Sequence, residues 1–330
     1  MKDILNQLFD HQKLSQEQAK EVLINISQDK YNSSQLAAFI SVYLMRNISV
    51  DELSGFRDAL LDLCIKVDFD DLPIIDLCGT GGDSKNTFNI STLASFVVAG
   101  AGHHVAKHGN YGVSSVSGSS NVLEYFGVQF TNETNILKKQ MDVAHICFLH
   151  APLFHPALKS VGPIRRELGV KTFFNMLGPL VNPARPQHQS VGVFSLKLAR
   201  LYQFLHENSN NRYAIIYATD GYDEVSLTSE VKLITNHAEQ LVEPSYFGLP
   251  KYTQEDIFGG ETVQQAADIF KSILENKGTG AQNDVVIANA ALAIQCFDQT
   301  KDIKDCVSEA RESLESGKAK SAFEKLLKVQ

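Results

Sequence analysis

The pattern of hydrophobic and polar residues divides the chain into an N-terminal helical part and a longer mixed part. Over residues 2 to about 66, apolar residues recur at helical spacing. Ser15 with Gln18, and Ser49 with Glu52, have the spacing of capping boxes that begin helices. Residues 68–71 are polar and form a predicted linker. We therefore expect a small helical domain at residues 1–70, without chemistry of its own.

From Pro73 onward, short apolar runs alternate with helical patterns. The runs typical of strands are 74–77, 105–106, 144–149, 190–194, 213–217 and 230–234. The helical patterns between and after them are 92–101, 122–126, 135–141, 196–206, 261–276, 283–297, 302–315 and 318–328. Such alternation indicates βαβ units and predicts an α/β domain with a mainly parallel sheet over residues 71–330.

A glycine-rich turn follows the first predicted strand, with Gly79, Gly81 and Gly82 ahead of the helix start at 89–92. Glycine lets backbone amides approach a ligand closely, and helix N-termini attract anions, so this stretch predicts a phosphate site. It is not the nucleotide-triphosphate loop G-x-x-x-x-G-K-[ST]. The dinucleotide fingerprint is also absent, because Ser84 stands where its third glycine is required. A plain turn at a strand end remains the alternative.

A second loop of the same kind, KHGNYGVSSVSGSSN at 107–121, follows the next predicted strand. It offers a cation at Lys107, three glycines and five serine hydroxyls. Loops that follow consecutive parallel strands meet at the carboxyl edge of the sheet, where open α/β folds bind ligands. One ligand with two separated phosphates would account for both loops.

Composition narrows the classes of protein. The 330 residues suggest about two domains, and 44% hydrophobic with 21% charged residues is typical of a globular protein. The formal net charge of −8 disfavours nucleic-acid and anionic-membrane partners. Five scattered cysteines without a C-x-x-C pair predict reduced thiols in the cytoplasm. No apolar stretch approaches about 18 residues and no signal peptide is recognisable, so we expect neither membrane insertion nor secretion.

Asp223 and Glu224 are adjacent acids that follow the predicted strand 213–217. Neighbouring carboxylates repel unless a divalent cation neutralises them, and Mg²⁺ commonly uses one or two carboxylates together with substrate phosphate oxygens. The pair is therefore a candidate metal site. A solvated acidic turn is the alternative.

Among the other charged residues, Arg165 is a candidate clamp for a carboxylate, because a guanidinium matches a carboxylate with two hydrogen bonds. The sequence alone does not distinguish it from Arg166 or from a surface arginine. His104 and His108 are four residues apart but flank a predicted strand end, so they do not form a helical zinc pair.

Six ordered blocks resemble the anthranilate phosphoribosyltransferases of tryptophan biosynthesis: GTGGD, NIST, KHGN with its serine-rich tail, HPALKSVGPIRRELG, TFFNMLGPLVNPA and DGYDEVS. The resemblance covers essentially the whole chain. It implies Mg²⁺-dependent transfer of phosphoribose from 5-phosphoribosyl-1-pyrophosphate to anthranilate, which is the second step from chorismate to tryptophan. It also implies a homodimer through the N-terminal helices. Part of 163–185 would join the helical domain, and the active site would lie in the cleft between the domains.

The resemblance also implies the site residues. Those that would bind phosphoribosyl pyrophosphate are Gly79, Gly82, Asp83, Thr87, Asn89, Ile90, Ser91, Thr92, Lys107, His108, Gly109, Asn110, Tyr111, Gly112, Val113, Ser114, Ser115 and Ser119. Those that would bind anthranilate are Gly79, Asn110 and Arg165, and those that would hold Mg²⁺, two ions per subunit, are Ser91, Asp223 and Glu224. No strong catalytic base is assigned. His108 and His155, which would line the cleft, are the candidates for proton transfer.

Two positions depart from the family pattern. Tyr111 stands where KHGN is usually followed by Arg, and Lys171 where Arg is common. A tyrosine donates one hydrogen bond but carries no charge, so we expect an effect on substrate affinity and not on the class of reaction.

Two rival functions are considered. A pyrimidine nucleoside phosphorylase has a similar architecture and a Lys-His loop, but would use phosphate and need no metal at Asp223 and Glu224. A non-catalytic paralogue that binds nucleic acid is opposed by the acidic balance and by the intact acidic pair.

Overall fold

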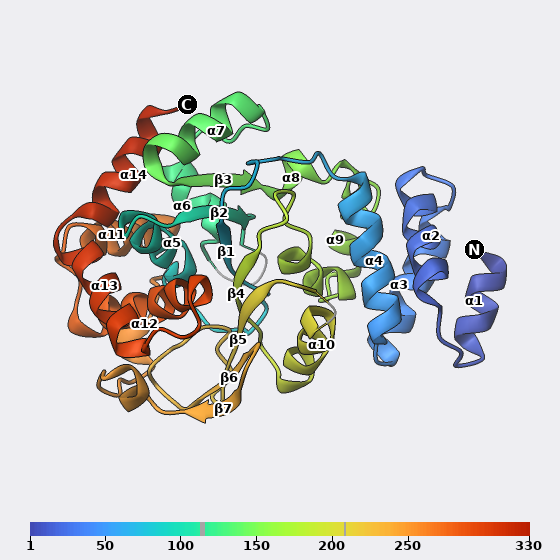
Figure 1. Ribbon diagram of the computed structural model, residues 1–330. Coiled ribbons are helices and arrows are strands. Elements are labelled where there is room, and N and C mark those ends of the chain that lie inside the picture. The colour runs from blue at the N-terminus through green and yellow to red at the C-terminus, as the bar shows by residue number, and fades with distance from the viewer. Residues whose placement is uncertain (113–115, 208) are drawn as a thin grey trace. The chain divides into compact units, whose positions relative to one another are not determined.

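The structure is a computed structural model that describes residues 1–112, 116–207 and 209–330 (Figure 1). The chain folds into two compact units, and each unit is built from two separate segments. The helical unit comprises Met1–Val67 and Ala151–Pro183, and the α/β unit comprises Asp68–His150 and Ala184–Gln330. Most of the proline-rich stretch 163–185 therefore clusters with the N-terminal helices.

The helical unit contains four N-terminal helices and several short helices from its second segment. These are α1 (Lys2–Phe9), α2 (Gln16–Ser27), α3 (Ser33–Met45), α4 (Val50–Leu63), α8 (Ala151–Phe154) and α9 (Gly162–Leu168), with 3₁₀ turns η1 (Pro156–Leu158), η2 (Phe173–Met176) and η3 (Gly178–Leu180). The predicted capping boxes at Ser15 and Ser49 are confirmed. Phe173 stacks on Phe56 with 4.7 Å between ring centroids, so aromatic packing joins the two segments into one core.

Glu52, a fully buried acid, is the polar centre of the helical unit. Its carboxylate accepts hydrogen bonds from the amides of Leu14 (3.0 Å) and Ser49 (2.9 Å), and it forms an ion pair with Arg46. Burial by itself would raise the pKa of Glu52, but the Arg46 and amide hydrogen bonds outweigh burial and hold the pKa below its usual range. The charged carboxylate therefore ties α4 to the chain before α2 and to the end of α3.

The α/β unit is built on a seven-stranded sheet in the order β3-β2-β1-β4-β5-β6-β7. The strands are β1 (Ile74–Gly79), β2 (His104–Gly109), β3 (Ile146–His150), β4 (His188–Gly192), β5 (Arg212–Ala218), β6 (Val231–Thr235) and β7 (Glu239–Val242). The pairings from β3 to β5 are parallel, while β6 and β7 are antiparallel. The expected mainly parallel sheet is confirmed, with an antiparallel extension at one edge.

Helices cover both faces of this sheet. They are α5 (Ile90–Gly100), α6 (Ser119–Tyr125), α7 (Thr134–Ala144), α10 (Leu196–Glu207), α11 (Val263–Leu274), α12 (Gly280–Phe297), α13 (Ile303–Glu315) and α14 (Lys318–Lys328), with 3₁₀ turns η4 (Pro244–Phe247) and η5 (Glu255–Ile257). In Figure 1, α5 and α11–α14 lie on one side of the sheet and α10 on the other. The main core lies between the sheet and α5, α12 and their neighbours.

Several details differ from the sequence-based prediction; the strand predicted at 190–194, for example, is β4 at His188–Gly192. The strand predicted at 144–149 begins at Ile146, because Ala144 ends α7 and His145 has a left-handed backbone (φ 57°) that stops the helix. Strand β7 was not predicted. It lies at the sheet edge with only Val242 buried, so it lacks the apolar run that marks the inner strands.

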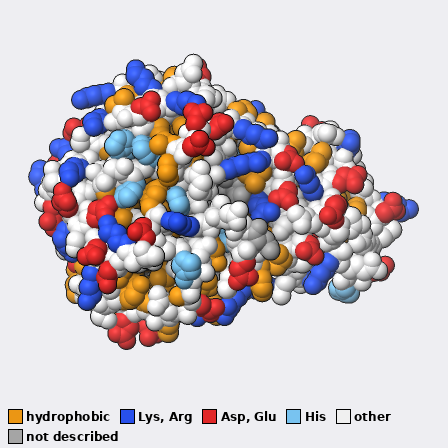
Figure 2. Space-filling model, viewed as in Figure 1, with side chains coloured by type: hydrophobic (Ala, Val, Ile, Leu, Met, Phe, Trp, Pro, Cys, Tyr) orange, Lys and Arg blue, Asp and Glu red, His pale blue; other side chains and the backbone are white. Residues whose placement is uncertain are grey.

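The surface and the helices agree with a globular protein. Figure 2 shows acidic and basic side chains interspersed over the visible face. Within the described ranges, no helix is both long and apolar enough to cross a membrane. The five cysteines are buried free thiols.

Candidate active site

The two predicted phosphate loops leave the same edge of the sheet. β1 ends at Gly79 and its parallel neighbour β2 ends at Gly109, so both loops begin at the carboxyl edge. Asn89, at the end of the first loop, donates a hydrogen bond from Nδ2 to the carbonyl oxygen of Ser117 in the second (2.9 Å). The structure thus brings the two loops together.

Glycines in the first loop allow an acidic side chain to approach the backbone. Gly81 and Gly82 have positive φ (62° and 79°), which favours glycine. A Cβ atom at Gly79 would lie 2.4 Å from Oδ2 of Asp223. The same oxygen accepts a hydrogen bond from the amide of Gly81 at 2.7 Å. The turn therefore holds the carboxylate of Asp223 through a backbone amide.

At the start of α5, where an anion site is predicted, the N-cap side chain makes no hydrogen bond to the first-turn amides. Asn89 is the N-cap residue, but its side chain makes no capping hydrogen bond and turns toward the second loop. Ile90, Ser91 and Thr92 form the first turn, where the positive end of the helix dipole lies. On the other side, Thr87 forms an antiparallel bridge with Phe258, which anchors the end of the first loop.

The predicted metal residues also come together. Asp223 and Glu224 follow β5, with Asp223 buried and Glu224 half-buried. Asp223 lies beside the carboxyl group of Asp83, and Glu224 accepts a hydrogen bond from the hydroxyl of Ser91. Asp223 is thus removed from solvent and Glu224 is partly removed, which disfavours a fully solvated acidic turn.

Burial and neighbouring negative charges raise the pKa values of both acids. Burial raises the pKa of Asp223, and the negative charge of Asp83 raises it further. Burial likewise raises the pKa of Glu224, with the charge of Asp223 adding to the rise and Lys107 opposing it. A compact set of hydroxyl and carboxylate oxygens whose charges are not fully neutralised suits a hard divalent cation such as Mg²⁺.

Lys107 lies beneath the loops, with only 2% of its surface exposed. Its Nζ donates to the carbonyl oxygen of Leu77 (2.6 Å) and lies 3.5 Å from the hydroxyl of Ser91. Burial lowers the pKa of Lys107, while the nearby charges of Asp76 and Glu224 favour its charged form. The ammonium group therefore sits next to the candidate metal ligands.

Asp76 is a residue that the sequence-based search missed. It is fully buried in β1, and its Oδ1 accepts a hydrogen bond from the amide of His108 (3.1 Å). An acid within an otherwise apolar strand was the signal that could have revealed it, because buried charges need partners. It joins β1 to β2 directly below the second loop.

Hydrogen bonds within the second loop shape it. The carbonyl oxygen of Asn110 accepts from the amide of Ser120 (3.1 Å) and the hydroxyl of Ser119 (3.3 Å). Oδ1 of Asn121 accepts from the amides of Gly112 (2.9 Å) and Gly118 (3.0 Å). These hydrogen bonds join the beginning of the loop to its end. The predicted donor-site residues Val113, Ser114 and Ser115 lie outside the described residues.

Tyr111, the departure from the family pattern, is held by neighbours on its own side of the loop. Its hydroxyl donates to Glu124 (3.2 Å), and its ring meets that of His150 edge-on, with centroids 5.0 Å apart. His150 is buried and shares a 2.9 Å hydrogen bond with the hydroxyl of Ser120. Tyr111 thus contributes packing where the family pattern has a cation.

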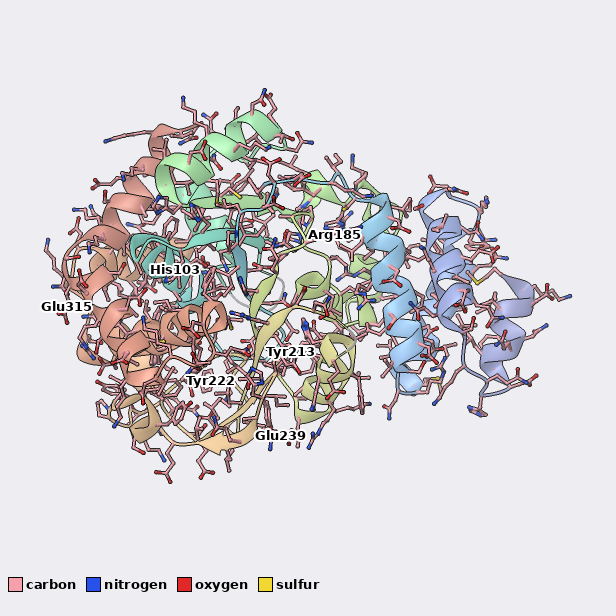
Figure 3. All side chains as sticks on the ribbon, in the orientation of Figure 1. His103, Arg185, Tyr213, Tyr222, Glu239 and Glu315 are labelled. Atoms are coloured by element: carbon pink, nitrogen blue, oxygen red, sulfur yellow. The ribbon has the colours of Figure 1, made fainter. Side chains whose placement is uncertain are left out.

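A second connection joins the first loop to the acidic one. Tyr222, labelled in Figure 3, immediately precedes Asp223. Nζ of Lys85 lies 4.7 Å from the centroid of its ring, a distance typical of a cation–π contact. The glycine loop and the acidic loop are therefore in contact at Tyr222 and at Asp223.

In the helical unit, the structure distinguishes Arg165 from Arg166. Arg166 is exposed, whereas Arg165 is half-buried, with its guanidinium 5.3 Å from the ring centroid of Phe174 and 3.4 Å from Oδ1 of Asn175. Burial lowers the pKa of Arg165. No acidic side chain in the described ranges forms an ion pair with it, so its charge is available to an anionic ligand.

The two candidate proton carriers belong to different units. His155 precedes η1 in the helical unit and is buried, and burial lowers its pKa to about 4. His108 is buried in β2 of the α/β unit. In the part of the chain that the structure describes, no group of three or more His, Cys, Asp or Glu side chains is arranged to hold a metal by itself.

Comparison with known proteins places the chain in a family. Residues 71–320 match the model of the glycosyl transferase family a/b domain, and residues 2–64 match the helical bundle domain of the same family. Anthranilate phosphoribosyltransferases from Christiangramia forsetii and Flavobacterium johnsoniae are 56% and 58% identical. The first alignment covers 100% of this chain and 99% of the relative, and the second covers 99% and 98%.

Solved structures agree with the sequence comparison. The crystal structure of anthranilate phosphoribosyltransferase from Thermus thermophilus matches with a TM-score of 0.90 and 30% identity, over 98% of both chains. The enzyme from Saccharomyces cerevisiae, solved in complex with PRPP and Mg, matches with a TM-score of 0.89 and 26% identity, over 98% of this chain and 96% of that one. With relatives more than half identical over the full length and the same two-domain fold, the chain belongs to the anthranilate phosphoribosyltransferase family.

Proposed function

We propose that the protein transfers phosphoribose from 5-phosphoribosyl-1-pyrophosphate to the amino group of anthranilate. The products are N-(5-phosphoribosyl)anthranilate and pyrophosphate, in the second step of tryptophan biosynthesis from chorismate. The observation that carries the proposal is the meeting of two Gly/Ser loops with the acidic pair of buried Asp223 and half-buried Glu224 at one sheet edge. Relatives solved with PRPP and Mg and with 4-fluoroanthranilate support it.

Ser91, Asp223 and Glu224 would hold Mg²⁺, with two ions per subunit. The raised pKa values of the two acids support this assignment, because a bound cation would offset both their burial and their mutual repulsion. When bound, the cation supplies charge stabilisation for the leaving pyrophosphate. Lys107, buried against Ser91, would add a fixed positive charge to the same place.

The residues of the chain would otherwise act by positioning the two substrates. The amides of the first loop and of the first turn of α5 would bind phosphate oxygens, and the second loop would bind the rest of the donor. The amine of anthranilate carries its own lone pair, so alignment with the anomeric carbon can supply much of the rate without a strong base. His108 and His155 are the proposed candidates for proton transfer; burial, which lowers the pKa of His155 to about 4, keeps that residue neutral near pH 7 and makes it a weak base.

Arg165 would bind the anthranilate carboxylate, with Asn110 and Gly79 as further contacts. Among the described residues, no acidic side chain pairs with this half-buried guanidinium, which supports the role. We also propose a homodimer through the N-terminal helices, where Phe9 and Met45 expose 57% and 90% of their surfaces. The buried free thiols are consistent with a reducing, cytoplasmic setting.

The first test follows the fluorescence of anthranilate after addition of the phosphoribosyl donor, with Mg²⁺ and then with excess chelator. We expect a loss of fluorescence that needs Mg²⁺ and stops when the metal is removed. No loss with folded protein would contradict the proposal. Phosphate-dependent cleavage of a pyrimidine nucleoside, without any need for Mg²⁺, would point to the phosphorylase instead.

A pH dependence of metal binding follows from the acidic pair. Burial raises the pKa values of Asp223 and Glu224, so both acids stay protonated at pH values above the ordinary carboxyl range of about 4. Mg²⁺ must therefore displace these protons when it binds. We expect tighter binding at pH of about 8 than at about 6, with proton release on binding. Calorimetry in two buffers of different ionisation enthalpy checks this. An affinity independent of pH over that range would contradict it.

A further inference from the structure

Asn289 is a buried polar residue to which no role in the reaction has been assigned. It lies in the middle of α12, in the layer of helices beside the sheet (Figure 1), and only 3% of its surface is exposed. Its Oδ1 accepts a hydrogen bond from the amide of Val225 (3.0 Å), and its Nδ2 donates to the carbonyl oxygen of Val225 (2.9 Å). The same Nδ2 also donates to the carbonyl oxygen of Val285 (2.8 Å).

The side-chain amide therefore pairs with both polar groups of one backbone residue, as a neighbouring strand would. Val225 is also buried, so without Asn289 its amide and carbonyl would have to find other partners. A simple packing residue does not need this geometry. The third hydrogen bond, to the preceding turn of α12, fixes the orientation of the amide, so that donor and acceptor sides are not interchangeable.

Val225 directly follows Glu224, so Asn289 fixes the chain on one side of the acidic pair. On the other side, the carbonyl oxygen of Asp223 lies so close to Gly192 that a Cβ atom there would be 1.4 Å from it. The amide of Gly81 holds the carboxylate of Asp223 itself. The acids are thus placed by the end of β4, by the first glycine loop and by α12.

We propose that Asn289 is a positioning residue that sets the affinity of the acidic pair for its divalent cation. The inference rests on the proposed metal site at Asp223 and Glu224, but concerns a residue remote in sequence that touches neither metal nor substrate. Groups that orient the ligands of a metal typically change its affinity 10- to 100-fold, roughly, when removed. Asn289 acts through the backbone of Val225, so its loss displaces the acids without changing their chemistry.

The test is direct binding of Mn²⁺, as a paramagnetic probe for the Mg²⁺ site, followed by electron spin resonance with inorganic pyrophosphate present and no turnover. For Asn289→Ala we expect a Kd about 10- to 100-fold higher than that of the unaltered protein. The activation constant for Mg²⁺ should rise by a similar factor, and saturating metal should restore most of kcat. The KM for anthranilate should change by less than about twofold, because the proposed clamp is elsewhere.

Asn283→Ala is the matched control, because Asn283 lies on the same helix and its side chain donates to the carbonyl oxygen of Gly278 (3.4 Å) and not to the acidic loop. It should leave metal affinity unchanged whatever it does to the melting temperature. Asn289→Asp, which keeps the acceptor for the Val225 amide but loses the donor, provides a second test if the alanine variant folds poorly.

Two outcomes overturn the inference, and they are distinguishable. If the double change Asp223→Asn and Glu224→Gln abolishes Mn²⁺ binding but both Asn289 variants bind as tightly as the unaltered protein, Asn289 has no positioning role and the metal site stands. If the double change leaves Mn²⁺ binding intact, the proposed metal site is wrong and the role of Asn289 is lost with it.

Discussion

Changing Asp223 to Asn and Glu224 to Gln together should abolish Mg²⁺-dependent turnover, with a loss of at least about 10³-fold in kcat/KM. The amides have nearly the same size as the acids but cannot carry the negative charge that would hold the cation. Anthranilate fluorescence in the presence of the donor and Mg²⁺ measures the effect. Undiminished activity would remove the metal assignment.

The same variant should remain folded. In the metal-free protein, the raised pKa values mean that the folded state binds these two protons more tightly than the unfolded state does. Their stabilising effect is present at low pH and is lost as the pH rises above the ordinary carboxyl range. Without metal at alkaline pH, the variant should therefore melt no lower than the unaltered protein. Glu230→Gln, which removes an exposed acid nearby, is the control for charge alone and should retain activity.

Arg165→Ala should raise the KM for anthranilate about 100-fold while changing the KM for the phosphoribosyl donor by less than about twofold. A charge-assisted interaction of roughly 3 kcal/mol corresponds to such a factor, since each 1.4 kcal/mol is about tenfold. Steady-state kinetics with each substrate varied in turn provides the measurement. The half-buried guanidinium has Phe174 and Asn175 as neighbours but no acidic partner in the described ranges, so little else should change.

Two further variants sharpen this test. Arg166→Ala, at the exposed neighbouring position, should affect neither KM. Arg165→Lys keeps the charge but loses the planar fork, and should fall between the unaltered protein and Arg165→Ala. Equal losses of affinity for both substrates in Arg165→Ala would contradict the assigned clamp.

Much of the α/β unit could be predicted because apolar runs mark several of its inner strands and are set between helical patterns. β1 and β5 illustrate this, since almost every residue in them is buried. The edge strand β7 could not be found in the same way, because an exposed edge needs no apolar signature. Local pattern thus predicts buried strands better than exposed ones, since β3, at the opposite edge of the sheet, is buried throughout and was predicted.

The candidate site shows a similar division. Glycines, serines and the acidic pair could be recognised from residue type and order. What could not be predicted was burial, which depends on contacts between distant segments: Lys107 against Leu77, Asp223 against Gly192, and Val225 against Asn289. Without the family resemblance, residue type alone could not choose between Arg165 and Arg166, because the choice depends on which side chain packs against Phe174.

The parallel pairing of β1 with β4 bears on how the protein is made. The amide of Ile74 bonds to the side chain of Gln187, 113 residues further along the chain, and the strands pair over the following residues. During synthesis β1 can pair with β2, and β2 with β3, long before β4 emerges, so the β1 edge of the growing sheet stays open. Open edges recruit other chains. Newly made chains should therefore be most prone to aggregation while residues 80–187 are being added, and nascent-chain protection should matter most in that interval.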